Sequence, residues 1–266
     1  MKFHKILNIA VAFILGESAV QAQDIHFSQF FASPLNLNPA TTGVLSCDLR
    51  FSAIYRNQWA SVMKGKAFST FSAGVETRFP VGKNDYWGLG LNLWADKAGT
   101  SSFSSVHGSI SASFIKRLMG GRRSNDMYLV AGGALGFSQK SINVLNLTFG
   151  EQWGGDQFNG NLSTGENFLD TRATYADLSA GLYWWMGLDS KNKSTLSAGV
   201  AFSHLTKANV SFLGQGFEAL FLKSTVHLGG DFRVGKRLAF VPQVVMMFQG
   251  PSVETNFGTS LRFDFS

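Results

Sequence analysis

The sequence is poor in charged residues, which make up 15% of its 266 residues, well below the roughly one quarter found in an ordinary soluble domain. It also holds only 5 prolines and a single cysteine, Cys47. One cysteine cannot form a disulfide within the chain, so no disulfide framework holds this fold. After the first residues there is no run of about eighteen apolar residues, which excludes a transmembrane helix of ordinary length.

The first 22 residues have the order of a secretory signal peptide. Two lysines precede an apolar stretch from Ile6 to Leu15, and Val20 and Ala22 occupy the two positions that a signal peptidase reads. The apolar stretch is too short to anchor the chain in a bilayer. An amphipathic surface helix is the alternative, but the stretch has no separate apolar and charged faces. We therefore expect cleavage after Ala22 and export from the cytoplasm.

Hydrophobic residues are abundant at 45%, and the chain contains 25 phenylalanines and 29 glycines. An exported chain of this composition without a helical span has one common way to cross lipid. A sheet closed into a barrel satisfies every backbone donor and acceptor where water cannot. The composition thus predicts an all-β fold, a transmembrane antiparallel up-and-down β-barrel in the outer membrane.

Apolar and polar residues alternate along about ten segments that are long enough to cross a membrane as tilted strands. In the third segment, the four apolar residues from Trp87 to Leu93 alternate with Gly88, Gly90 and Asn92. A soluble β-sandwich shows the same alternation. Long segments, many of more than ten residues, favour a membrane barrel, and so do aromatic residues near strand ends, namely Tyr86, Trp87, Trp94, Trp59 and Tyr128. The segments lie near 47–59, 66–79, 85–96, 103–117, 126–138, 173–186, 194–206, 222–233, 237–249 and 256–265.

Connection lengths give a second indication of the same fold. If the N-terminus is periplasmic, every second connection is a short inner turn, near 80–84, 118–125, 187–193 and 233–236. The alternate set contains the two longest connections, 139–172 and 207–221. Outer-membrane barrels have short periplasmic turns and longer extracellular loops. We therefore expect Gly160 to face the cell exterior and Lys191 to face the periplasm.

The stretch between the signal and the first strand, residues 23–43, reads QDIHFSQFFASPLNLNPATTG. Its two prolines and its lack of periodicity predict neither a helix nor a strand. It carries a set of residues that continues into the first strand as a YR-x-QW element: Phe27, Ser28, Gln29, Pro34, Asn38, Pro39, Ala40, Gly43, Tyr55, Arg56, Gln58 and Trp59. In these twelve motif residues the chain resembles the PorP/SprF family, and the resemblance runs more diffusely to the end of the chain.

The resemblance implies an outer-membrane component of the type IX secretion system of Bacteroidetes, which supports the secretion or surface attachment of cargo such as adhesins and gliding-motility proteins. It implies as partners the outer-membrane lipid, the secreted cargo and other secretion components, including a periplasmic lipoprotein linked to peptidoglycan. The twelve motif residues become candidates for partner contacts. The expected organisation is a signal peptide at 1–22, a periplasmic N-terminal segment at 23–46 and the barrel at 47–266. Family members usually have further strands, so we expect the barrel to be incomplete at its C-terminal end.

Other functions leave fewer marks on the sequence. There is no GxSxG, HExxH or phosphate-binding glycine loop, and no two mature histidines stand at metal-ligand spacing. We therefore expect no enzyme, no cofactor and no catalytic or metal site, although a Ser-His pair assembled across strands would not show in the sequence. No module of aromatic and basic residues indicates a nucleic-acid partner. A passive pore for small solutes is the main alternative.

Some side chains can be placed on one face of the predicted sheet. His107 and His227 share the parity of small and polar neighbours, which indicates hydrogen bonding in the lumen. His204 falls on the apolar parity at the end of its strand, as an interfacial histidine does. Glu76 and Arg78 share a face and are expected to form an ion pair.

Phe27, Phe30 and Phe31 of the N-terminal segment need apolar cover. The barrel mouth or a periplasmic partner would provide it.

Overall fold

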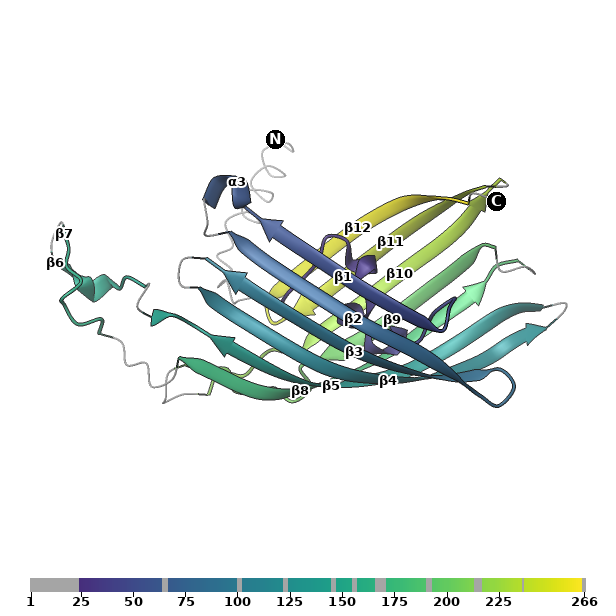
Figure 1. Ribbon diagram of the computed structural model, residues 1–266, viewed down its shortest axis with the longest axis horizontal. Coiled ribbons are helices and arrows are strands. Elements are labelled where there is room, and N and C mark those ends of the chain that lie inside the picture. The colour runs from purple at the N-terminus through teal and green to yellow at the C-terminus, as the bar shows by residue number, and fades with distance from the viewer. Residues whose placement is uncertain are drawn as a thin grey trace, which may run out of the picture.

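A computed structural model describes most of the chain, and the predicted signal peptide lies outside the described residues. Ten strands form one antiparallel sheet in which each strand pairs with the next along the chain. Figure 1 shows that this sheet curls into a half-barrel around a hollow. The predicted all-β, antiparallel up-and-down architecture is therefore confirmed. The described residues are 24–63, 67–99, 102–121, 124–144, 147–154, 157–165, 171–189, 193–212, 217–235 and 237–264.

The strands of the sheet are β1 (Leu49–Gln58), β2 (Phe68–Val81), β3 (Asp85–Ala98), β4 (Phe103–Gly121), β5 (Ser124–Ser141), β8 (Arg172–Gly187), β9 (Thr195–Ser203), β10 (Lys223–Val234), β11 (Leu238–Gln249) and β12 (Ser252–Phe263). A separate hairpin consists of β6 (Trp153–Gly154) and β7 (Gln157–Phe158). The short helices are η1 (Phe30–Ala32), α2 (Pro34–Leu37), η2 (Pro39–Thr41), α3 (Ala60–Met63) and η4 (Gly150–Gln152). None of the described helices is long and apolar enough to cross a membrane.

Each of the ten predicted segments coincides with one strand of the sheet. The largest differences at a boundary are of four residues: β4 ends at Gly121 instead of residue 117, and the last strand begins at Ser252 instead of residue 256. Only Gly250 and Pro251 separate it from β11, and Gly250 has a φ of 55°. A glycine adopts this left-handed conformation without strain. The turn is therefore tighter than the sequence pattern suggested.

The two faces of the sheet differ as the alternation predicted. In β3, Leu89, Leu91 and Leu93 expose 43–51% of their surface on the outer face, whereas Gly88 and Asn92 are buried on the inner face. Similar exposed apolar residues occur on most other strands. An outer belt of large apolar side chains is what a lipid-facing barrel surface requires.

Of the five aromatic residues expected at the membrane interfaces, Trp87 and Trp59 are exposed, whereas Tyr86, Trp94 and Tyr128 lie on the inner face instead. Trp94 is 8% exposed, and its ring stacks on His107 with centroids 5.3 Å apart. Tyr86 and Tyr128 pack against the buried cluster around Ala40. For these three the expectation was wrong because they share the parity of inward residues on their strands, and proximity to a strand end does not change that parity.

The connections sort by length as predicted. The two longest, 142–171 and 204–222, leave the same end of the sheet, which we call the long-loop end. The opposite end carries the connections 82–84, 122–123, 188–194 and 235–237, and we call it the short-turn end. Gly160 belongs to the long-loop end, whereas Lys191 lies outside the described residues. Which end faces the cell exterior stays a prediction.

The sheet is open along one side. β1 pairs with β2 and β12 pairs with β11, and in the described part of the chain no bridge joins β1 to β12. The outer side chains of β12 are strongly exposed, with Phe257 at 74%.

The N-terminal segment, residues 24–48, occupies the hollow of the half-barrel, where η1, α2 and η2 appear as the purple ribbon in Figure 1. It begins beside Lys223 and Gln249 at the long-loop end and continues into β1 at the short-turn end. Between these ends η2 contacts β4, β5, β8 and β9. The segment therefore runs through the hollow along the inner face of the sheet.

Candidate functional site

Asn38 is the residue by which the N-terminal segment is fixed to the wall. Its Oδ1 accepts a hydrogen bond from Ala40 N at 2.9 Å, which caps η2. Its Nδ2 donates to Leu182 O at 3.0 Å and to Val200 O at 3.3 Å, and lies 3.1 Å from His227 Nε2. The side chain is fully buried. Because its amide both donates and accepts hydrogen bonds, no buried polar group is left unpaired. Pro39 at the first helical position suits the helix start.

The wall is shaped to receive this segment by glycines that belong to different strands. A Cβ atom on Gly132 of β5 would lie 2.6 Å from Ala40 Cα, and one on Gly181 of β8 would lie 2.1 Å from Asn38 Oδ1. A Cβ atom on Gly88 of β3 would lie 2.4 Å from Thr42 O. Glycine within a strand commonly marks a close backbone approach. A Cβ atom on Gly199 of β9 would lie 2.2 Å from His227 Nε2 of the wall and 2.9 Å from Asn38 Nδ2 of the segment. We call Gly88, Gly132, Gly181 and Gly199 the glycine track.

A buried carboxylate holds the segment where it leaves the hollow. Glu76 is 2% exposed, and its Oε2 accepts from Gly43 N at 2.8 Å. Its Oε1 accepts from Arg50 Nε and Nη2 at 2.9 and 2.6 Å. Gly43 has a φ of 73°, a conformation that favours glycine.

The predicted pair of Glu76 with Arg78 is wrong. Arg50 lies directly opposite Glu76 in the β1–β2 register. Arg78 instead donates to Leu45 O and lies over the ring of Tyr86.

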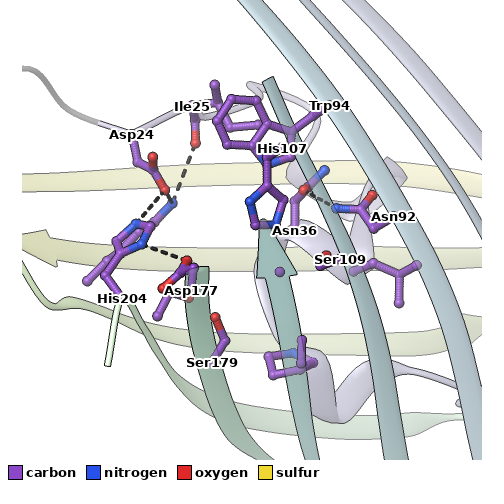
Figure 2. A pocket seen from close by; sticks show the side chains of 16 residues that line it. Asp24, Ile25, Asn36, Asn92, Trp94, His107, Ser109, Asp177, Ser179 and His204 are labelled. Atoms are coloured by element: carbon purple, nitrogen blue, oxygen red, sulfur yellow. Dashed lines mark hydrogen bonds and ion pairs between the residues drawn. The ribbon is translucent and has the colours of Figure 1, made fainter. Parts of the chain in front are cut away.

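A second charged cluster lies at the long-loop end, where Figure 2 shows His204 between two carboxylates. His204 Nδ1 lies 2.8 Å from Asp177 Oδ2, and His204 Nε2 lies 3.0 Å from Asp24 Oδ2. Lys223 Nζ donates to Asp24 Oδ2 at 3.3 Å. We call Asp24, Asp177, His204 and Lys223 the histidine cluster. It ties the start of the segment to β8, the end of β9 and β10.

The expectation of an interfacial His204 is wrong, because its side chain is 5% exposed and lies in the hollow. Its φ is 61°, and this left-handed conformation, rare outside glycine, interrupts the alternation of the strand. Burial alone would lower the pKa of His204, but the two carboxylates outweigh it and raise the pKa to about 9. Burial alone would raise the pKa of Asp24, but Lys223 and His204 hold it below its usual range.

A polar cavity of about 50 Å³ lies between the segment and the wall beside the histidine cluster (Figure 2). His107 lines it and makes a 2.7 Å hydrogen bond with Ser138 through Nδ1, so the lumen placement predicted for His107 and His227 is confirmed. Asn92 Nδ2 donates to Asn36 Oδ1 at 2.6 Å. Among the residues that the structure describes, no group of three or more His, Cys, Asp or Glu side chains could hold a metal ion.

The motif residues separate into two sets. The buried set fixes the segment in the hollow: Phe27, Asn38, Pro39, Ala40 and Gly43, with Pro34 partly buried. The exposed set lies at the surface: Ser28, Gln29, Tyr55 and Trp59. Arg56 Nη1 joins the two by donating to His26 O at 2.6 Å, and Gln58 is partly buried on the inner parity of β1. Of the three phenylalanines that needed cover, Phe27 and Phe30 are buried in the described chain and Phe31 is 45% exposed.

Two parts of this site were not identified from the sequence. The glycine track was visible only as glycines on the inner parity, with nothing to indicate which segment would lie on them. The histidine cluster combines residues up to 199 positions apart, and the φ of His204 reverses the face that parity assigns to it.

A comparison with protein families agrees with the motif and the fold. The family described as the type IX secretion system membrane protein PorP/SprF matches residues 19–266, nearly the whole chain. The chain belongs to the PorP/SprF family. Neither a curated protein nor a solved structure matches it. As a PorP/SprF protein it is a membrane component of the type IX secretion system, and its family is one of secretion proteins and not of enzymes.

Proposed function

We propose that this PorP/SprF protein is a non-enzymatic component of the outer membrane that supports the secretion or surface attachment of type IX cargo, including adhesins and proteins of gliding motility. The observation that carries the proposal is the placement of the motif. Its buried half fixes the N-terminal segment to the inner wall, and its exposed half remains at the surface. This division suits a barrel that presents a fixed segment to partners.

The proposal gives the two halves of the motif different roles. Asn38 and its neighbours hold the segment in one conformation, which lowers the entropy that a partner must overcome on binding. Tyr55 and Trp59, which are 64% and 55% exposed near the long-loop end, are candidates for the contact itself. Tyrosine and tryptophan are enriched among the residues that dominate binding energy at interfaces. At the long-loop end the partner would be secreted cargo. Other secretion components and a lipoprotein linked to peptidoglycan would bind at the short-turn end.

The compartment of each end follows from loop length. We place the long-loop end at the cell exterior and the short-turn end in the periplasm, as outer-membrane barrels are oriented. The expected signal peptide at 1–22 would deliver the chain there. The periplasmic location expected for residues 23–46 stays a prediction, since the described part, 24–46, lies between the two ends of the sheet.

Alanine at Phe27, Asn38 and Pro39 together tests the proposal. We expect surface cargo to be lost from whole cells while the barrel remains in the outer membrane at normal levels. Thr259→Ala, an exposed change on the outer face of β12, is the control. Heat-modified migration on a gel reports whether the variant barrel is folded. Normal cargo display by a folded triple variant would overturn the proposal.

The passive pore is distinguished by conductance. The segment fills much of the hollow, where Ala40, Ile115 and Val130 form a buried cluster. We therefore expect little ion current through the purified protein in a planar bilayer. A steady current of porin size in the unaltered protein would favour the pore instead.

A further inference from the structure

The short-turn end of the hollow contains a cavity of about 440 Å³ between the end of the N-terminal segment and the wall. This volume is in the range of pockets that bind small molecules. Most of its lining is apolar or aromatic. The lining residues that matter here are Leu45, Ile115, Val130, Tyr86, Tyr128 and Trp185. The rings of Tyr128 and Trp185 pack against each other, with centroids 5.7 Å apart.

Two charged residues, Asp126 and Arg78, also line this cavity, and they differ in their partners. Asp126 forms an ion pair with Arg117. Arg78 donates to Leu45 O and lies 5.0 Å from the centre of the Tyr86 ring. Within the described residues no salt bridge joins Arg78 to a carboxylate. The guanidinium carries five N–H donors, so it can still receive an anion at the edge of an apolar pocket.

The turns at the short-turn end are rich in basic residues in the sequence. In the sequence, the four connections of the short-turn end contain seven basic residues and one acidic residue, Asp189. The connections of the long-loop end contain three basic and five acidic residues, four of the acidic ones in 142–171. A surface of one sign attracts and orients partners of the other sign. The seven basic residues are Lys83, Arg122, Arg123, Lys191, Lys193, Lys236 and Arg237.

We propose that this cavity is a docking site for an acidic peptide segment of a partner protein, in which one aromatic side chain enters the cavity and a neighbouring carboxylate pairs with Arg78. The aromatic lining suits an aromatic side chain, and the cavity has room to admit one. A single guanidinium without a carboxylate partner among the described residues suits one carboxylate, and guanidinium–carboxylate pairs are strong when bidentate. The basic turns suit the remaining acidic residues of the segment. That this partner is periplasmic rests on the orientation given under the proposed function. The docking site itself does not depend on that orientation.

The test uses the purified full-length protein in detergent and a short fluorescein-labelled peptide of Glu and Asp around one central Phe. Fluorescence anisotropy measures its dissociation constant at low salt. We expect Arg78→Gln to weaken binding about tenfold, the equivalent of about 1.4 kcal/mol. Arg172→Gln, which removes an exposed arginine at the long-loop end, is the matched control and should leave binding unchanged. A peptide with Ser in place of Phe should bind more weakly to the unaltered protein.

A second variant covers the case in which Arg78→Gln disturbs the end of the N-terminal segment. Ser46 is exposed and lines the cavity, so Ser46→Trp should block the cavity without removing a buried contact. It should abolish the preference for the Phe peptide over the Ser peptide.

Equal binding of the Phe and Ser peptides to the unaltered protein would overturn the proposal. So would a Kd that neither variant changes. Binding of dodecanoate in an Arg78-dependent manner, with no binding of the acidic peptide, would show a site for fatty acids instead. Because these measurements need no cells, their failure leaves the secretion test of the proposed function untouched, and loss of secretion in that test does not decide the docking site.

Discussion

Ala40 lies directly against Gly132, close enough that a Cβ atom on residue 132 would stand 2.6 Å from Ala40 Cα. The obstructing atoms belong to the backbone of the N-terminal segment, which cannot move aside as a flexible side chain can. The adjacent Gly133 has no such neighbour, because its Cβ would meet only Ser179 O at 3.4 Å. Comparing alanine at these two neighbouring positions therefore distinguishes a clash with the segment from the general effect of replacing a strand glycine with alanine.

We predict that Gly132→Ala displaces the segment from the wall, whereas Gly133→Ala does not. Limited proteolysis of the folded barrel measures this, because a displaced segment exposes its backbone around residues 30–43. Cleavage should become at least several-fold faster in Gly132→Ala. Equal cleavage rates in both variants would show that the segment is not held against the track.

The strands were predictable because each carries its own alternation, as the third segment shows with Leu89, Leu91 and Leu93 outside and Asn92 inside. The path of the N-terminal segment was not predictable, since it has no periodicity of its own. It is specified by contacts with wall residues far away in the sequence, such as those from Asn38 to Leu182 and Val200. The motif included Asn38, but it did not indicate that the side chain of Asn38 is buried.

The small and polar residues of the inner face lie where the N-terminal segment packs against the wall. Asn92 is 4% exposed and hydrogen-bonded to Asn36 of the segment. The short side chain of the wall at this position leaves space that the N-terminal segment occupies. The sequence also could not assign the partner of Glu76, because that partner is determined by the register between β1 and β2.

The pair of Arg50 and Glu76 predicts an asymmetric response to mutation. The Glu76 side chain is 1% exposed and that of Arg50 is 34% exposed. Arg50→Leu leaves a buried carboxylate without its cation, which we expect to cost about 2–4 kcal/mol. Glu76→Leu leaves a partly hydrated arginine and an unpaired Gly43 N–H, and should cost about 1–2 kcal/mol.

Urea unfolding of the barrel in lipid vesicles measures these free energies. The double variant should be more stable than Arg50→Leu alone, because it removes the buried charge together with its partner. If the two single costs simply add in the double variant, the residues are not energetically coupled.

The histidine cluster predicts that the segment is held most tightly in mildly acidic solution. The pKa of His204 is raised from 6.5 to about 9, so its contribution is complete below pH 6.5 and is lost as the pH rises through 9. The pKa of Asp24 is lowered from 3.8, so its contribution is complete above that pH and is lost in stronger acid. The segment should therefore be most stable between about pH 4 and 6.5.

Amide hydrogen exchange of residues 24–43, corrected for the intrinsic dependence of exchange on pH, measures how often the segment opens away from the wall. Between pH 6.5 and 9.5 the opening of the segment should increase about tenfold or more. His204→Gln should remove most of that increase and raise the opening at pH 6. An unchanged pH profile in His204→Gln would rule out the cluster as its source.

The orientation of the barrel predicts which cysteines an impermeant reagent reaches on intact cells. In a Cys47→Ser background, we expect Gly160→Cys, at the long-loop end, to be labelled. Lys193→Cys, at the short-turn end, should be labelled only after the outer membrane is permeabilised. The opposite pattern would reverse the assignment of exterior and periplasm.

The outer belt of β3 predicts a dependence of mutational cost on depth in the membrane. Leu91 lies in the middle of β3 and is 43% exposed on the outer face, whereas Val81, also exposed, is the last residue of β2 at the short-turn end. An arginine at the bilayer midplane of a barrel costs about 2–4 kcal/mol, and one near the interface about 0–1 kcal/mol. Leu91→Arg should therefore destabilise the barrel in lipid vesicles by at least about 1 kcal/mol more than Val81→Arg. Both positions are solvent-exposed in a protein without lipid, where arginine at either would cost little. Equal small costs in vesicles would mean that this face does not contact the hydrocarbon core.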